Sequence, residues 1–175
     1  MTWKFCPNCG REATVIKQDD TNYECSRCGW HFWNNAKGTA TTIFMNKDGE
    51  ILFSKRAIDP HKGKYDIPGG FINYNENAYD AAVREVREES GVTIKKPELL
   101  GVWHNEYLPG QVSTCDLMFI ATEWEGEFVP QDDVAALEWK PITFIESDQF
   151  AWSYPGMLEQ LQAFAARMKD NADVS

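Results

Sequence analysis

Long hydrophobic runs are missing from this sequence of 175 residues. No apolar stretch approaches the roughly 18–20 residues that a membrane-spanning helix needs, and the first residues lack the apolar segment of a signal peptide. We therefore expect a cytoplasmic protein with no membrane partner. Internal repeats and low-complexity segments are also missing. A chain of this length without them predicts one globular domain, with room for a small appendage.

Positive charge is scarce. The chain carries 17 Lys and Arg against 27 Asp and Glu, which gives a formal net charge of −10. An acidic surface repels the phosphate backbone of nucleic acid, so broad nucleic-acid binding is unlikely on charge alone. A phosphate-bearing small molecule held through a metal ion remains compatible with this balance.

The five cysteines are an odd number, which argues against a disulfide framework. Four of them form two C-x₂-C pairs, Cys6 with Cys9 and Cys25 with Cys28, separated by fifteen residues. This spacing is typical of a zinc ribbon, in which four thiolates surround a structural Zn²⁺ ion. Free thiols or a redox pair are the alternatives, and the doubled spacing disfavours both. Cys115 is expected to be a small buried residue.

A closed shell of four thiolates leaves no position for water, so the zinc is expected to stabilise a segment too short for its own core. Basic residues are few in this segment and form no stripe for nucleic acid. Trp30, Phe32 and Trp33 follow, and packing between modules is favoured over base stacking. Residues 34–38 have the composition of a linker. We therefore predict a zinc ribbon over residues 1–37 and a second domain over residues 38–175.

The second domain is expected to open with strands. Residues 39–46 and 50–54 are apolar and β-branched around a turn at 47–49, which predicts a hairpin. A basic loop, residues 55–65, follows it. Arg56 and Lys64 in this loop are candidates for contacts to substrate phosphates, although a solvated loop is the simpler alternative. Gly69 lets the backbone approach a ligand closely, so it is a further candidate.

A helix is predicted directly after this loop. Asn75 or Asn77 can cap its start, and Gly91 can end it in a left-handed conformation. The face expected to be buried comprises Tyr79, Ala82, Val83, Val86 and Ser90.

Three carboxylates of this helix, on Glu85, Glu88 and Glu89, project within an arc of about 100°. Like charges at this spacing repel, so they call for a counter-charge, and Mg²⁺ or Mn²⁺ prefers such oxygen ligands. Ordinary ion pairs with Arg84 on a solvated helix face are the alternative.

Further strands and a helix are predicted downstream. Residues 99–107 and 113–124 should form two strands around the turn at Pro109 and Gly110, and residues 137–140 a short strand. Residues 155–169 have the periodicity of an amphipathic helix. The expected fold class is therefore α/β, with a mixed sheet covered by helices.

The loop and the acidic helix together match a longer pattern of fixed positions, over about residues 70–92. With it, the chain resembles the Nudix hydrolases, the MutT-like family, over about residues 38–169. The matching positions are Gly70, Glu76, Arg84, Glu85, Val86, Glu88, Glu89, Gly91 and Val92.

The resemblance implies an α/β/α sandwich and hydrolysis of the diphosphate linkage in a nucleoside diphosphate joined to another group. It implies Mg²⁺ held by Glu85, Glu88 and Glu89, with a carbonyl of Gly70 as a further ligand. Glu88 or Glu89 could also accept a proton.

Two further roles follow from the same resemblance. Arg84 is implied to pair with Glu76, which holds the loop against the helix. An additional carboxylate is often drawn from the loop before the last strand, and Asp133 or Glu127 could supply it.

The substrate is less well defined. A zinc ribbon ahead of this domain resembles the layout of NADH pyrophosphatases, but their Ser-Gln-Pro-Trp-type motif is missing from residues 105–110. ADP-ribose pyrophosphatases carry a proline at a distance similar to that of Pro109, which a hairpin turn also explains. Tyr107 is a candidate for stacking on a base or ribose.

We favour ADP-ribose or an NADH-like dinucleotide as the small-molecule partner. The alternatives are a nucleoside triphosphate pyrophosphohydrolase and a non-catalytic nucleotide-sensing module that uses the ribbon to bind nucleic acid or protein. A homodimer is compatible with the aromatic content.

Overall fold

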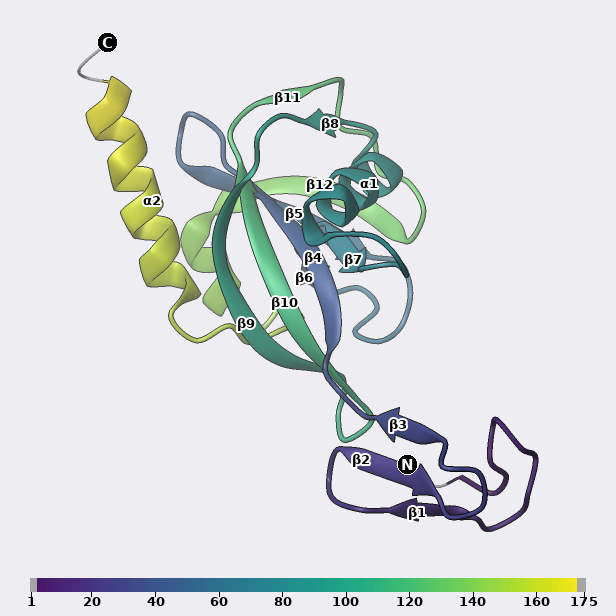
Figure 1. Ribbon diagram of the computed structural model, residues 1–175. Coiled ribbons are helices and arrows are strands. Elements are labelled where there is room, and N and C mark those ends of the chain that lie inside the picture. The colour runs from purple at the N-terminus through teal and green to yellow at the C-terminus, as the bar shows by residue number, and fades with distance from the viewer. Residues whose placement is uncertain (1–2, 173–175) are drawn as a thin grey trace.

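The computed structural model describes residues 3–172 of the chain. Two helices, α1 (Ala78–Ser90) and α2 (Met157–Ala172), lie on opposite sides of the central strands, as Figure 1 shows. The mixed α/β fold class predicted from the sequence is confirmed. None of the described helices combines the length and apolarity needed to cross a membrane.

The N-terminal segment forms a small antiparallel sheet in the order β1 (Val15–Lys17), β2 (Asn22–Cys25) and β3 (His31–Trp33). It lies at one end of the molecule, away from both helices (Figure 1). The rings of Trp30 and Phe32 stack at 6.0 Å, and Trp3 meets both edge-on. These aromatic rings pack against one another within the ribbon, because the segment has little other core.

The central strands form two sheets and a short pair. The first sheet has the order β7 (Gly69–Phe71), β4 (Lys37–Phe44), β10 (Val112–Ala121) and β9 (Glu98–Leu108). Strands β4 and β10 are parallel and the other neighbours antiparallel, so the sheet is mixed. The second sheet, β12 (Val134–Pro141), β5 (Glu50–Arg56) and β6 (Tyr65–Asp66), is antiparallel. Strands β8 (Thr93–Ile94) and β11 (Trp124–Glu125) form the pair, and the 3₁₀ helix η1 (Ile142–Glu146) follows β12.

The strands and the turn predicted around residues 47–49 are present, but they form a hairpin only at the turn. An antiparallel bridge joins Met45 and Ile51, and the N–H of Asn46 donates to the carbonyl of Glu50 at 3.0 Å, whereas strands β4 and β5 themselves lie in different sheets. Both strands are buried in continuous runs rather than at alternate positions. Such runs are typical of strands covered on both faces, which the apolar pattern alone did not distinguish from a hairpin.

Strand β4 begins at Lys37, so the end of the predicted linker belongs to the strand. The domain boundary after residue 37 stays a prediction. The turn predicted between the strands around Pro109 and Gly110 is confirmed, since β9 and β10 pair antiparallel across it. The C-terminal helix begins two residues after Pro155.

The core lies on both sides of the strands because successive side chains point to opposite faces. On the α2 side, Ile43, Met118 and Phe53 pack with Met157 and Leu161. On the α1 side, a second cluster is built from Phe44, Leu52, Val86, Val92, Ile94 and Ala121. Helices on both sides of the sheets give the sandwich its three layers.

We expect Leu161→Ala to lower the free energy of unfolding by about 2–5 kcal/mol, because Leu161 is fully buried in the α2-side cluster. Gln162→Ala, one residue along on the exposed side of α2, is the control and should change it by less than about 0.5 kcal/mol. Urea unfolding followed by circular dichroism measures both. Equal small effects would mean that α2 does not cover the sheet.

Candidate active site and metal centre

Helix α1 carries the acidic residues, and its two ends are fixed by caps. The side chain of Asn77 accepts a hydrogen bond from the backbone N–H of Asp80 at 2.9 Å. Gly91 adopts φ 74°, and its N–H donates to the carbonyl of Arg87 at 3.1 Å. Asn77 is therefore the cap of the two candidates, whereas Asn75 lies in the preceding turn with φ 63°.

The buried face of α1 differs from the prediction: Val83 is only partly buried, and Ala81 is buried as well. Ala82, Val86 and Ser90 are buried as expected, but Tyr79 is 43% exposed. Glu89 is buried instead, at 8% exposure, and its carboxylate accepts the backbone N–H of Gly69 at 3.0 Å. Helical spacing could not show this, because strand β7 supplies the donor from a distant part of the chain.

Arg84 connects the loop before α1 to the helix. Its Nε and one terminal nitrogen donate to the two carboxylate oxygens of Glu76, both at 2.8 Å. The other terminal nitrogen donates to Glu85 at 2.6 Å and to Glu88 at 3.1 Å. A further bond at 3.1 Å reaches the carbonyl of Phe71. The structure therefore brings Arg84 and Glu76 together in a bidentate ion pair, as the resemblance implied.

The pKa values of these carboxyl groups diverge. Arg84 lowers the pKa of Glu76 from its ordinary 4.5 to about 2. Burial raises the pKa of Glu85, and Arg84 opposes that rise. Burial also raises the pKa of Glu89 well above its usual range, and the nearby charges of Asp133, Asp66 and Glu85 add to the effect. None of the ion pairs within residues 3–172 neutralises Glu89.

Two glycines allow β7 to pass close to this helix. A Cβ atom on Gly70 would lie 2.6 Å from a carboxylate oxygen of Glu85. A Cβ on Gly69, whose φ is 152°, would lie 2.5 Å from the Cα of Thr41. Backbone atoms of β4 therefore exclude any side chain at position 69, whereas a side chain at position 70 would displace the Glu85 carboxylate.

A cavity opens beside these groups. Seven of the residues proposed from the sequence line it: Arg56, Gly69, Gly70, Glu85, Glu89, Tyr107 and Asp133. The other candidates do not line it, and Arg84 and Glu76 form the ion pair beside it. Glu88 turns toward Arg84 with a half-exposed side chain, Lys64 lies exposed in the basic loop, and Glu127 lies near Gly91 at the far end of α1. Glu85 and Glu89 thus line the cavity, and Glu88 lies next to Glu85 across the Arg84 guanidinium.

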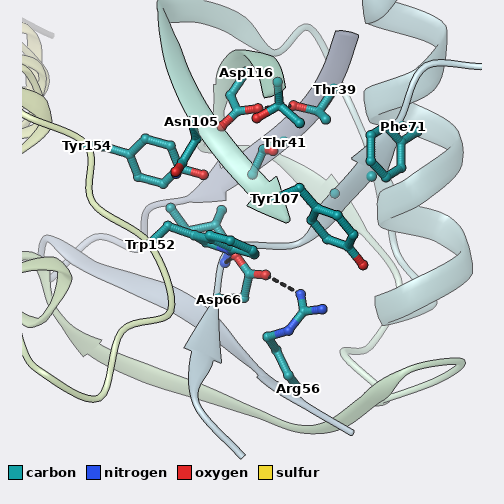
Figure 2. A pocket seen from close by; sticks show the side chains of 14 residues that line it. Thr39, Thr41, Arg56, Asp66, Phe71, Asn105, Tyr107, Asp116, Trp152 and Tyr154 are labelled. Atoms are coloured by element: carbon teal, nitrogen blue, oxygen red, sulfur yellow. Dashed lines mark hydrogen bonds and ion pairs between the residues drawn. The ribbon is translucent and has the colours of Figure 1, made fainter. Parts of the chain in front are cut away.

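A second cavity shares seven lining residues with the first, so the two are continuous. Figure 2 shows its side chains, with Arg56 donating to Asp66 at 2.6 Å. The Arg56 guanidinium also lies 5.7 Å from the ring centroid of Trp152.

Among the lining residues of this cavity that sequence reasoning missed are Asp66, Asn105, Asp116, Trp152 and Tyr154. One signal was available, since Asp116 directly precedes the apolar run Leu117–Ala121 of its strand.

The residues of the acidic site fit a hard divalent cation. Glu85 and Glu89 offer oxygen ligands, and Glu89 lies buried among like charges without a cationic partner of its own. Glu85 and Glu88 are drawn to the Arg84 guanidinium, which supplies part of the positive charge. A bound Mg²⁺ would supply the remainder.

Four sulfur atoms form the second candidate metal centre. The Sγ atoms of Cys6, Cys9, Cys25 and Cys28 all lie within 4.8 Å of one another. Cys6 and Cys28 are 3.8 Å apart, and Cys9 and Cys25 are 3.9 Å apart. Tetrahedral zinc with Zn–S bonds of about 2.3 Å requires sulfur atoms about 3.8 Å apart. The cluster therefore fits the predicted zinc ribbon, and Cys115 takes no part in it.

Arg84→Ala should remove most of the pH dependence that Glu76 gives to stability. The pKa of Glu76 is lower in the folded protein, so the pair stabilises the fold above pH 4.5, and this contribution is lost as the pH falls toward 2. We expect the difference in the free energy of unfolding between wild type and Arg84→Ala to become smaller as the pH falls from 4.5 toward 2, as measured by urea titrations at each pH. Arg87→Ala, an exposed arginine of the same helix, is the control. A difference in unfolding free energy that does not change with pH would contradict the assigned ion pair between Arg84 and Glu76.

We expect the protein purified without chelator to contain one zinc ion per chain, measured by plasma mass spectrometry. Cys25→Ser should lose the metal, because three thiolates remain. Cys115→Ser should keep it, since this thiol lies outside the cluster. Full zinc content in Cys25→Ser would show that the four sulfurs do not hold the ion.

Comparisons with known proteins agree with this architecture. The NUDIX domain family matches residues 36–161. An ADP-ribose pyrophosphatase from Methanocaldococcus jannaschii is 35% identical over 94 residues, which are 54% of this chain and 56% of that protein. An NAD-capped RNA hydrolase, NudC, from Pseudomonas aeruginosa is 30% identical over 130 residues, which are 74% of this chain and 44% of that protein. The chain thus spans about half the length of these relatives.

Solved structures show the same fold. A NUDIX hydrolase from Nitrosomonas europaea superposes with a TM-score of 0.69 at 26% identity, covering 94% of this chain and 91% of that one. The NUDIX domain of Shewanella oneidensis NrtR, solved in complex with ADP ribose, superposes with a TM-score of 0.62 at 18% identity, covering 74% of this chain and 88% of that one. At this identity the match supports the fold alone. With the family match extending over most of the sequence, the chain belongs to the NUDIX domain family.

Proposed function

We propose that this protein hydrolyses the diphosphate linkage of a nucleoside diphosphate derivative, either ADP-ribose or an NADH-like dinucleotide, with Mg²⁺ or Mn²⁺ at the acidic site. One observation carries the proposal. The cavity lined by Glu85 and Glu89 continues into a second, aromatic-lined cavity, with Arg56 at their junction. A diphosphate flanked by two bulky groups suits this shape better than a compact phosphate.

The named relatives support the same substrate class. One is called an ADP-ribose pyrophosphatase and the other an NAD-capped RNA hydrolase. ADP-ribose and NAD share an adenosine diphosphate unit joined to a second group, which is the class that the two connected cavities suit.

Each residue of the acidic site has a proposed role in the reaction. Glu85 and Glu89, with Glu88 beside them, would hold the cation, which supplies positive charge to the phosphate oxygens and lowers the pKa of a bound water. Arg84 is a positioning residue that keeps Glu85 and Glu88 in place. Arg56 would bind a phosphate oxygen, although Asp66 already holds part of its guanidinium.

Asp133 is our choice for the additional carboxylate. It lines the cavity, and its charge raises the pKa of Glu89, whereas Glu127 does not line the cavity. A carboxylate at this place could accept a proton from the attacking water. The water oxygen would bond to phosphorus as the bridging P–O bond breaks, so ADP-ribose would give AMP and a sugar phosphate.

The zinc ribbon is proposed to stabilise the N-terminal segment rather than to act in the reaction. Its four thiolates would fill the coordination shell of zinc, and its residues line neither cavity.

The test is a panel of ADP-ribose, NADH and nucleoside triphosphates incubated with Mg²⁺, with products separated by chromatography. We expect AMP from ADP-ribose or NADH, and a loss of about 10²–10⁴-fold in kcat for Glu89→Gln, which keeps the shape but removes the charge. Glu123→Gln, an exposed carboxylate outside both cavities, is the matched control.

Two results would overturn the proposal. Faster release of pyrophosphate from triphosphates than of AMP from ADP-ribose would favour the triphosphate alternative. Tight nucleotide binding without turnover of any member of the panel would favour a sensing module.

A further inference from the structure

Arg56 lies at the junction of the two cavities, and three contacts fix its side chain. Its Nε donates to the carbonyl of Pro60 at 2.6 Å, and one terminal nitrogen donates to Asp66 at 2.6 Å (Figure 2). Its guanidinium lies over the ring of Trp152, 5.7 Å from the ring centroid. The side chain is only 12% exposed. A long side chain that would otherwise sample many rotamers is thereby held in one orientation.

The backbone on either side of this arginine is fixed as well. The N–H of Arg56 donates to the carbonyl of Lys64 at 2.9 Å, and its carbonyl accepts the N–H of Gly63 at 2.9 Å. Arg56 is the last residue of β5, so these bonds continue the strand into the basic loop. The guanidinium is therefore anchored at both its stem and its head.

One terminal nitrogen of Arg56 remains free. It donates no hydrogen bond to any group within residues 3–172. Arg56 lines the acidic cavity together with Asp133 and Tyr107. Burial acts to lower the pKa of Arg56, but the charge and hydrogen bond of Asp66 raise it overall, and Tyr107 and Asp133 add to the rise. The guanidinium is thus charged and keeps a donor for a ligand.

Asp66 determines which nitrogen stays free. It is the last residue of β6, which pairs with β5. Its second oxygen accepts the N–H of Ile67 at 2.8 Å, and its side chain is 16% exposed. Burial raises the pKa of Asp66, whereas hydrogen bonds from Trp152, Arg56 and Ile67 favour its charged form. A carboxylate held by several donors gives Arg56 a fixed partner.

Stability alone does not account for this pair. A buried ion pair is weak evidence for stabilisation, because the desolvation of both charges offsets their attraction. Orientation is the better explanation, since an arginine that is already fixed loses less conformational freedom when it binds a phosphate oxygen.

We propose that Asp66 is a positioning residue, which occupies one terminal nitrogen of Arg56 so that the other is presented to a phosphate oxygen of the substrate. Pro60 occupies Nε in the same way. The arginine therefore approaches the phosphate through a single terminal nitrogen, not through the two nitrogens of a bidentate pair. This inference rests on the proposed hydrolysis of nucleoside diphosphate derivatives.

A double-mutant cycle between Asp66 and Arg56 tests the inference, with kcat/KM for ADP-ribose and Mg²⁺ as the measured quantity. Arg56→Ala alone should lower kcat/KM by about 10–100-fold, because it removes a charged hydrogen bond to the phosphate. Asp66→Ala should lower it by about 10-fold in the wild-type background and by less than about 2-fold in the Arg56→Ala background. Equal factors in both backgrounds would overturn the positioning role.

Chemical rescue separates positioning from a purely structural role. Guanidinium chloride, added to Arg56→Ala at a concentration too low to unfold the protein, should restore part of kcat/KM, because Asp66 can hold the free cation where the side chain was. The double variant should show no such recovery. Equal recovery with and without Asp66 would contradict the proposal.

Asp148→Ala is the control, since Asp148 is exposed and lines neither cavity, and it should keep the wild-type kcat/KM. If Asp66→Ala fails to fold by circular dichroism, Asp66→Asn keeps the shape of the side chain but removes its charge. It should give a smaller loss that again depends on Arg56.

Two further outcomes separate this inference from the proposed hydrolysis. Without turnover in wild type, the same cycle is measured from the calorimetric Kd of ADP-ribose, and coupling between Asp66 and Arg56 there would overturn only the hydrolysis. Absence of both turnover and ADP-ribose binding would overturn both proposals.

Discussion

A single guanidinium group organises the acidic site. Arg84 binds Glu76 through two bonds and holds Glu85 and Glu88 through a third nitrogen, while it also reaches the carbonyl of Phe71. One positive charge thereby faces three negative ones, and the loop before α1 is fixed to the helix. Without this contact, like-charge repulsion would separate the carboxylates that the site needs together.

The guanidinium does not reach Glu89. That carboxylate is buried, accepts only a backbone N–H among its described contacts, and lies near the charges of Glu85, Asp66 and Asp133. Uncompensated charge in a buried place favours either a proton or a cation. The excess of negative charge beside Glu89 is therefore the physical basis for proposing a divalent ion at this end of the cavity, next to Arg56.

Local features were predictable from the sequence. The ends of α1, the turn at Pro109 and Gly110, and the four-cysteine cluster depend on neighbouring residues or fixed spacing. Features that depend on distant partners were not. The separation of β4 from β5 follows from pairing with β10 and β12, whose register partners lie 77 to 91 residues further along the chain.

The same distinction applies within the site. The pairing of Arg84 with Glu76 could be expected from a resemblance, but the burial of Glu89 depends on where β7 passes. Asp116 and Asn105 come together only through the register of β9 and β10. A polar residue next to an apolar run marks such a place without saying what it faces.

The two halves of the cavity are encoded by different parts of the chain. The carboxylates belong to helix α1, whereas part of the second cavity is lined by β4, β9 and β10. Substitutions on these three strands can therefore change the lining of the second cavity while the helix and its ion pairs stay as they are.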